Sequence, residues 1–228
     1  ACGLGESGIG LQIQDLMKES KNPTVGTLAA TGDVRIRITA KADNPEEADR
    51  LIQEMEQEIR KRLGKLIYGV DDETLQENIV RHLEKLHLSV SLAEAFTGGL
   101  ISQKLTGTRS PAFLQGIVLP SETSQRRFLD LSEEEFDSIR KDLRKMTGSF
   151  AERMKQETKS DLGLAVCGLI SEDQTKGEFR VRICHSLATS EGMENEEHEL
   201  GGEPPIVRER SAIIGLDLLR KYLLKADS

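Results

Sequence analysis

The sequence feature that most constrains the fold is the run LGLAVCGLI at positions 162–170, which contains no polar side chain. A strand with one solvent-exposed face would alternate apolar and polar residues, so this run is typical of a strand covered on both faces. Such a strand needs helices on either side of its sheet. The segments 129–159, with acids early and bases late, and 207–224, which is amphipathic, predict such helices.

Further elements of the same kind surround this strand. A strand is predicted at 112–119 (AFLQGIVL), which we expect to be buried, and another at 178–186 (EFRVRICHS). A helix is predicted at 75–86, and the acidic stretch 191–199 is expected to form an exposed hairpin or loop. Strands that alternate with helices predict a three-layer α/β/α domain over residues 73–228.

Residues 1–72 predict a smaller α+β domain before it, with the boundary at the acidic helix cap Asp71-Asp72-Glu73-Thr74. Its strongest signal is Asn44-Pro45, a cap residue followed by proline in the first helical turn. The predicted elements, in chain order, are a helix at 11–18, strands at 24–29 and 34–40, a helix from Asn44 to Gly64 and a strand at 66–70.

Composition excludes several classes of protein. A net charge of −8, a pI near 5.2 and 4% aromatic residues argue against nucleic-acid binding, since that needs clustered cations or stacking rings. Cys2, Cys167 and Cys184 are too scattered for a disulfide framework, which fits a reducing cytoplasm. No apolar window is long enough for a membrane span. The chain begins without Met, so we expect a processed or shortened protein.

Histidines and arginines are candidate ligand-binding groups. The four histidines (His82, His87, His185 and His198) show no metal-ligand spacing, so neither a metal nor a cofactor is expected. His185 and its neighbour Cys184 should point to opposite faces of one strand. Arg208 and Arg210 lie near the start of the last helix, where cations oppose the helix dipole, which indicates contact with a ligand or partner.

The segment 91–105 (SLAEAFTGGLISQKL) predicts a strand, a turn at Thr97-Gly98-Gly99 and an amphipathic helix. At such a turn, unpaired backbone N–H groups and the helix dipole can bind a phosphate or a developing oxyanion. The alternative is a tight turn that binds nothing, because Thr-Gly-Gly is a weak pattern on its own.

A hydrolase built on this turn needs a nucleophile just before it, but Ala95 and Phe96 have no nucleophilic atom. Thr97 is the nearest hydroxyl, and its other role would be to hydrogen-bond the turn. Cys167 lies in the apolar strand towards its carboxyl end, where open α/β sheets bind ligands. The other interpretation of Cys167 is a buried core thiol.

The segment AEAFTGGLISQKLT resembles the AESCTGG motif of the CinA C-terminal domain, the nicotinamide-nucleotide amidase family of competence/damage-inducible proteins. FLQGIVLPSETSQRRFLDL is similar to that family's FLGGVVTYSNEAKIRLLGV, DLGLAVCGL to its DLALAVTGI, and IVRERSAIIGLDLLRKYL to its closing helix. Residues 3–75 are similar to the family's KH-like segment. The resemblance implies a KH-like domain at 1–72 and an amidase-like domain at 73–228. A molybdopterin-binding-like domain normally precedes both.

Active family members hydrolyse the carboxamide of nicotinamide mononucleotide to nicotinic acid mononucleotide and ammonia. The resemblance implies a Ser nucleophile in the ESCTGG motif, assisted by a Tyr and a Lys of the TYSNEAK loop. These three positions fall on Ala95, Pro120 and Gln125, and the Cys of the motif falls on Phe96. No catalytic residue is therefore expected at the family's positions.

Other positions match the family and imply a retained ligand-binding frame. They are Glu94, Thr97, Gly98, Gly99, Gly116, Ser121 and Gly168. We therefore expect a non-catalytic protein, a pseudoenzyme that binds a pyridine nucleotide or another small anion or that serves assembly, with a homodimer as the expected oligomer. The alternative is an active amidohydrolase in which Cys167 or Thr97 has become the nucleophile.

Overall fold

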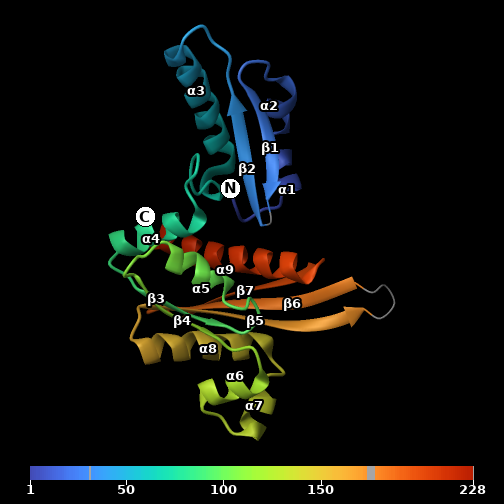
Figure 1. The fold of residues 1–228 in the computed structure, drawn as a ribbon, viewed down its shortest axis with the longest axis vertical. Helices are drawn as coiled ribbons and strands as arrows, with labels where there is room; N and C mark the ends of the chain where they lie inside the picture. The colour runs from blue at the N-terminus through green and yellow to red at the C-terminus, as the bar shows by residue number, and fades with distance from the viewer. Residues whose placement is uncertain (31, 174–177, 228) are drawn as a thin grey trace. The chain divides into compact units, whose positions relative to one another are not determined.

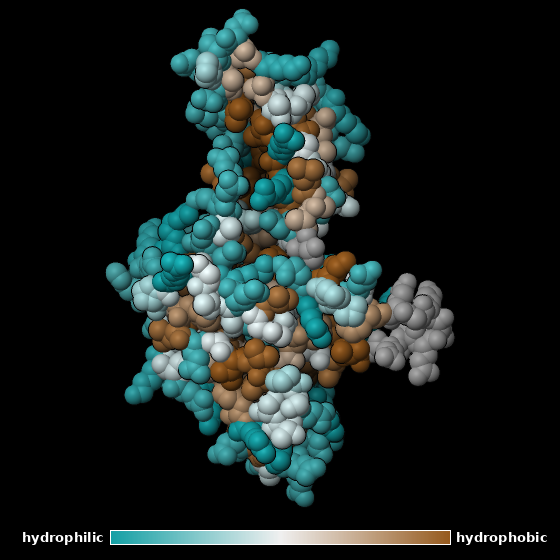
Figure 2. Space-filling model, in the orientation of Figure 1, coloured by the Kyte–Doolittle hydropathy of each residue, from teal (hydrophilic) through white to brown (hydrophobic). Residues whose placement is uncertain are grey.

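The computed structural model of the chain describes residues 1–30, 32–173 and 178–227 (Figure 1). The chain divides into two compact units, Ala1–Asp72 and Glu73–Ser228. None of the described helices combines the length and the apolar character that crossing a membrane requires. The face in Figure 2 carries hydrophilic side chains over much of both units, with hydrophobic residues in small groups between them.

The first unit is a small α+β unit. Its elements are α1 (Glu6–Gln12), α2 (Gln14–Glu19), the antiparallel pair β1 (Thr24–Ala30) and β2 (Asp33–Thr39), and α3 (Pro45–Leu63). As predicted, Asn44 starts α3, because its side chain accepts a hydrogen bond from the Glu47 N–H at 2.8 Å. The helices pack on the strands around a core of Ile9, Ile13, Val25, Val34, Ile59 and Leu63.

Two predictions for this unit were wrong. The single helix at 11–18 is in fact two short helices that meet at Ile13. The strand at 66–70 is instead a 3-10 turn, Gly64–Leu66, followed by residues that pair with no described strand. Leu66 and Ile67 explain the apolar pattern, because both pack against the core although they join no sheet.

The second unit is a three-layer α/β/α sandwich, as predicted. Its sheet has the order β4-β3-β5-β6-β7. The strands are β3 (Val90–Glu94), β4 (Phe113–Val118), β5 (Leu162–Asp173), β6 (Glu178–Ala188) and β7 (Met193–Gly201). β4, β3 and β5 run parallel, whereas β6 and β7 continue from β5 as antiparallel neighbours. β5 occupies the centre of the sheet, and its residues from Leu162 to Cys167 are buried, as the apolar run predicted. The end of the run was predicted wrongly, because Leu169 and Ile170 are 38% and 57% exposed.

Helices cover both faces of this sheet (Figure 1). On one face, α8 (Leu143–Thr158) packs on β3, β5 and β6, with α6 (Glu122–Leu129) and α7 (Glu133–Ile139) against it. On the other face, α9 (Pro204–Ala226) packs on β5 and β6 and is flanked by α4 (Leu75–Lys85) and α5 (Leu100–Gly107). Helix α6 was not predicted; Ser121 starts it by accepting a hydrogen bond from the Ser124 N–H.

The prediction that residues 112–119 form a buried strand was wrong in one respect. The segment does contain strand β4, but among the described strands β4 pairs with β3 alone and forms the edge of the sheet. Its side chains are therefore largely exposed, with Leu114 at 49% and Val118 at 45%. An apolar sequence at an edge gives the same pattern as a central strand, so the sequence alone does not separate them.

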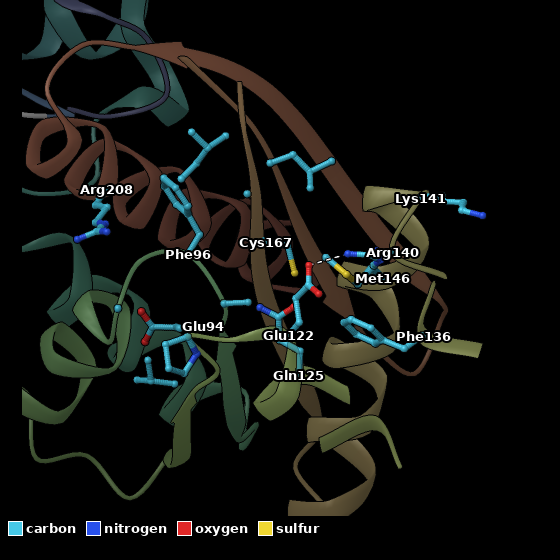
Figure 3. A pocket seen from close by; sticks show the side chains of 17 residues that line it. Glu94, Phe96, Glu122, Gln125, Phe136, Arg140, Lys141, Met146, Cys167 and Arg208 are labelled. Carbon is cyan, nitrogen blue, oxygen red and sulfur yellow. Dashed lines mark hydrogen bonds and ion pairs between the residues drawn. The ribbon is translucent and has the colours of Figure 1, made fainter. Parts of the chain in front are cut away.

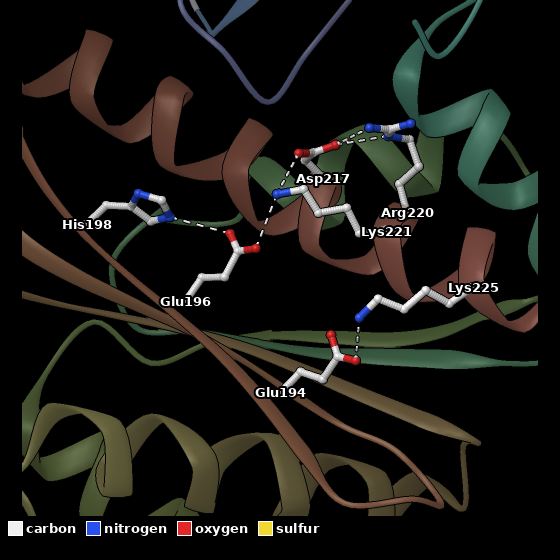
Figure 4. A network of polar contacts seen from close by, with 7 residues as sticks. All are labelled: Glu194, Glu196, His198, Asp217, Arg220, Lys221 and Lys225. Atoms are coloured by element: carbon white, nitrogen blue, oxygen red, sulfur yellow. Dashed lines mark hydrogen bonds and ion pairs between the residues drawn. The ribbon is translucent and has the colours of Figure 1, made fainter. Parts of the chain in front are cut away.

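The acidic stretch 191–199 forms most of the other edge strand, β7, in a hairpin with β6. Ion pairs hold β7 to the helices on both faces. Glu194 and Glu196 pair with Lys225 and Lys221 of α9, each at 3.1 Å (Figure 4). On the other face, Glu197 pairs with Arg144 of α8 at 2.9 Å. The acidic residues thus dock the strand through paired charges.

Candidate functional site

The candidate site begins at the turn between β3 and α5, which has the predicted strand-turn-helix form. Gly98 and Gly99 have φ values of 69° and 98°, a left-handed backbone that glycine adopts without strain. Gly99 is the N-cap residue of α5. The backbone N–H groups of the first helical turn therefore point out of the N-terminal end of the helix, towards any acceptor placed there.

That position is filled by the chain itself. The carboxylate of Glu94 is fully buried, and its Oε2 accepts hydrogen bonds from Thr97 Oγ1 at 2.5 Å, Gly99 N at 3.0 Å and Ile101 N at 3.2 Å. Its Oε1 accepts from the backbone N at 2.8 Å and the hydroxyl at 2.5 Å of Ser102. A carboxylate here satisfies the free N–H groups and the helix dipole. The N–H groups that we predicted for a ligand anion therefore already hold one.

Next to this turn lies a cavity of about 830 Å³ at the carboxyl ends of β3 and β4 and over β5 (Figure 3). Open α/β sheets bind their ligands at this position. The cavity is lined by Glu94, Ala95, Phe96, Gly98, Val118, Pro120, Glu122, Gln125, Phe136, Arg140, Lys141, Met146, Cys167, Gly168, Leu169, Ile170 and Arg208.

The structure brings the three substituted family positions together, because Ala95, Pro120 and Gln125 all line this cavity. None of the described residues that line it is a Ser, Thr, Tyr or His. The Gln125 amide donates a hydrogen bond to the Leu119 carbonyl at 3.1 Å, so it is held against the backbone of the loop after β4. These three side chains contain no group that activates a nucleophile.

Phe96 narrows the cavity beside the turn. Its ring lies so close to Gly168 that a Cβ added there would be 2.5 Å from Phe96 Cδ2. A side chain larger than that of glycine at position 168 would therefore collide with this ring. Both residues line the cavity and form part of its wall.

The two alternative nucleophiles lie in different surroundings. Cys167 lines the cavity but is only 1% exposed, and burial raises the pKa of its thiol to about 12. Its Cα faces Cys184 across the β5–β6 ladder. Thr97 is also 1% exposed, and its hydroxyl donates a hydrogen bond to the Glu94 carboxylate. This is the other role considered for Thr97, a hydrogen bond within the turn. A thiol of this pKa is almost entirely protonated near neutral pH and therefore a weak nucleophile.

Four of the seven predicted ligand-binding residues do not line the cavity. Gly116 lies beneath α5, where a Cβ would be 2.1 Å from Ser102 Oγ, so this glycine lets strand and helix approach. Ser121 caps α6. Glu94, Gly98 and Gly168 do line the cavity, whereas Thr97 and Gly99 contribute to the turn behind it. A contact between any of these residues and a ligand remains a prediction.

The cationic residues of the turn between α7 and α8 were not predicted as part of the site. Arg140 and Lys141 line the cavity, and Arg140 pairs with Glu122 at 2.6 Å and Asp137 at 2.8 Å. The capped start of α7 at Ser132 and the acids after it could have located this helix, but not its closeness to the β3–α5 turn. Arg208, which the sequence singled out, does line the cavity; Arg210 does not.

His185 lies on the other face of the sheet from Cys184, as predicted. Cys184 packs in the core under α8, while His185 Nε2 lies 2.9 Å from the Ser211 carbonyl of α9. Burial lowers the pKa of His185 to about 4, which keeps the ring neutral. His185 is not among the described residues that line the cavity. Within residues 1–30, 32–173 and 178–227, no group of three or more His, Cys, Asp or Glu is placed to hold a metal ion.

A mixed sheet between two helical layers, with a cavity at the carboxyl ends of its parallel strands, defines a three-layer α/β/α domain with a ligand-binding architecture. Comparison with known proteins identifies the family to which this domain belongs. Residues 1–69 match the damage-inducible protein CinA KH domain, and residues 72–223 match the CinA C-terminal domain. The chain belongs to the CinA family.

Relatives of known sequence agree with this assignment. The chain is 31% identical to a CinA-like protein of Kosmotoga olearia and 34% identical to one of Dictyoglomus turgidum, over 97% and 98% of its length. It is 30% identical to a putative competence-damage inducible protein of Bacillus subtilis, over 97% of its length. The chain spans only 54–55% of the length of these relatives.

Solved structures share the fold. A CinA superfamily protein from Klebsiella pneumoniae 700603 superposes with a TM-score of 0.58 at 17% identity, covering 67% of this chain and 99% of that one. A competence/damage inducible protein from Agrobacterium tumefaciens gives 0.52 at 23% identity, covering 68% and 98%. At this identity the likeness concerns the fold alone.

Proposed function

We propose that the second unit is a CinA domain that binds a pyridine nucleotide or another small anion in its cavity without hydrolysing it. The observation that carries this proposal is the convergence of Ala95, Pro120 and Gln125 on one cavity. Each occupies the position of a reactive group in the amidase family that the sequence resembles. On this proposal, Glu94, Gly98 and Gly168 remain in the cavity lining, whereas the reactive groups of the family are absent from it.

The chemical argument concerns what amide hydrolysis requires. A nucleophile must lie within hydrogen-bond reach of a base that takes its proton, or must ionise by itself. Ala95 has no atom to attack with, and the amide of Gln125 is not a base at neutral pH. Cys167 has no histidine beside it in the described cavity lining.

Retained binding is supported by the shape and charge of the cavity. Its volume of about 830 Å³ exceeds that of a small inorganic ion and falls in the range of nucleotide and cofactor sites. Arg140, Lys141 and Arg208 contribute three positive charges to the lining, against Glu94 and Glu122. The Glu94 charge is already bound within the β3–α5 turn.

A second candidate is an amidohydrolase that uses Cys167. The specific observation in its favour is that Cys167 lines the cavity beside Gly168. The raised pKa of the Cys167 thiol argues against this candidate, because the thiolate rather than the thiol attacks an amide.

One experiment separates the two candidates. Nicotinamide mononucleotide is incubated with the protein at high concentration while ammonia release and ligand-induced thermal shift are measured on the same samples. Binding to the folded state must raise its stability. A thermal shift without ammonia supports the proposal. Ammonia release that Cys167→Ala abolishes would establish the hydrolase instead, and the absence of both signals would contradict ligand binding.

A further inference from the structure

The two edges of the sheet in the second unit differ in charge. β7 carries four glutamates between Met193 and Gly201, and three of them pair with cations of α8 and α9. At the other edge, the stretch 110–121, which contains β4, has no charged side chain. Charged residues on an edge strand oppose its pairing with a strand of another chain. β7 is therefore protected against such pairing, whereas β4 is not.

The outer edge of β4 offers backbone groups for pairing. Glu94 of β3 is the register partner of Val118, but its carbonyl accepts a hydrogen bond from the Leu119 N–H at 2.8 Å. In this parallel pairing, the N–H and C=O groups of Val118 point away from β3, and those of Gly116 point the same way. Gly116 is exposed although α5 approaches it on one face. Because glycine has no side chain, its exposed surface is backbone.

Exposed apolar side chains lie beside these backbone groups. Leu114 and Val118 are 49% and 45% exposed. An antiparallel pair of two β4 strands centred on Gly116 places Leu114 of each copy beside Val118 of the other. Such a pair removes both apolar side chains from water, and apolar contacts across neighbouring strands stabilise a sheet.

The charges that flank the strand are complementary in the same arrangement. Arg109 lies four residues before β4, and Glu122 lies four residues after it. In an antiparallel pair, the segment before one strand lies beside the segment after the other, so Arg109 of each copy comes close to Glu122 of the other. Arg109 is exposed and has no ion-pair partner in the described part of the chain. Glu122 is 70% exposed and pairs with Arg140 (Figure 3).

We propose that the edge of β4 is a self-association surface, at which a second copy of this chain pairs its own β4 in antiparallel orientation about a two-fold axis. Each copy contributes the same strand, so the interface is closed and covers both unprotected edges. The two five-stranded sheets then continue into one another. The inference does not rest on ligand binding, although Val118 and Glu122 also line the cavity and the second copy would border it.

Sedimentation velocity of the full chain, over a series from micromolar to millimolar concentration, measures the dissociation constant of the dimer. Leu114→Lys should raise this constant by about tenfold or more, because it places a charge in each half of the paired edge. Leu28→Lys is the matched control, since Leu28 lies in strand β1 of the first unit and is 55% exposed. The control should leave the constant unchanged, and circular dichroism checks that both variants keep their fold.

An exchange of charges tests the antiparallel orientation. Arg109→Glu and Glu122→Arg should each raise the dissociation constant by about threefold or more, because like charges then face each other. The double variant restores opposite charges and should recover most of the lost affinity. Hydrogen exchange gives an independent readout, since the amide protons of Gly116 and Val118 should exchange more slowly in the dimer than in the monomer.

Several results would overturn this inference. One is a chain that stays monomeric over the whole concentration series. Another is a dimer that Leu114→Lys leaves intact or that Leu28→Lys dissociates, because the interface would then lie elsewhere in the chain. Exchange rates at Gly116 and Val118 that do not change with protein concentration would likewise exclude pairing at this edge.

Discussion

The carboxylate of Glu94 accepts two hydrogen bonds from Ser102, one from the backbone N–H at 2.8 Å and one from the hydroxyl at 2.5 Å. These contacts join the last residue of β3 to the first turn of α5. The helix N-terminus that resembles an anion-binding site is in this way closed by an internal anion. A ligand anion must therefore be sought at the cationic residues of the cavity.

We expect Glu94→Gln to destabilise the second unit by about 2 to 4 kcal/mol, because a buried, charge-assisted network loses its acceptor and gains an amide N–H facing other donors. Urea unfolding followed by circular dichroism measures the change. Glu122→Gln is the matched control, since that side chain is 70% exposed and should shift stability by less than about 0.5 kcal/mol. Equal effects of the two substitutions would show that the Glu94 network does not hold the turn.

Gly168→Ala should destabilise the protein by about 1 to 3 kcal/mol, because the new methyl group meets the ring of Phe96. The cost should fall by more than about 1 kcal/mol when the same substitution is made in a Phe96→Ala background. A double-mutant cycle on unfolding free energies checks this. Additive effects would mean that the ring does not pack against Gly168.

Ala95→Ser alone should not restore amidase activity. The new hydroxyl would lie in the cavity beside Pro120 and Gln125, neither of which takes up its proton. Ammonia release from nicotinamide mononucleotide is the measurement, with the unmodified chain as baseline. Turnover by the single variant would refute the proposal that Pro120 and Gln125 leave a hydroxyl at this position without a base.

The stability of the second unit should fall as the pH decreases from about 6.5 to about 4. Burial lowers the pKa of His185 to about 4 in the folded protein, whereas in the unfolded chain the ring ionises near 6.5. Below pH 6.5 the unfolded state therefore binds a proton that the folded state does not bind until the pH approaches 4. In the described structure His185 Nδ1 has no hydrogen-bond partner, so a proton added there would be uncompensated.

The expected loss over this range is about 2 to 3 kcal/mol from this residue. Unfolding free energies of the unmodified chain and of His185→Gln, measured from pH 7 to pH 4, isolate its share. The variant should show the shallower decline. Parallel profiles would contradict a buried, neutral His185.

Much of the fold follows from local signals in the sequence. The apolar run 162–170 predicts the central strand and hence both helical layers, and Asn44 and Thr74 mark helix starts that the structure places as expected. Local signals do not predict how a segment packs against residues that are distant in the sequence. Residues 112–119 are as apolar as a central strand, but only the sheet order makes them an edge.

The site was predictable only in part, for the same reason. The Thr97–Gly99 turn and the substituted positions at Ala95, Pro120 and Gln125 can be located in the sequence. The bonds from the turn to Glu94 cannot, because they depend on the side chain folding back over the helix start. Lys141 lies more than forty residues from the turn in the chain, and only the packing of α7 and α8 brings it to the cavity.

The central claim is that the cavity binds without catalysis, and the most direct measurement is a single-turnover incubation. Nicotinamide mononucleotide is mixed with an excess of the protein, and nicotinic acid mononucleotide is quantified by mass spectrometry over several hours. If the cavity binds without catalysis, no product should appear above the level of a heat-denatured control. Product that accumulates with time and disappears in Cys167→Ala or Thr97→Val would contradict it.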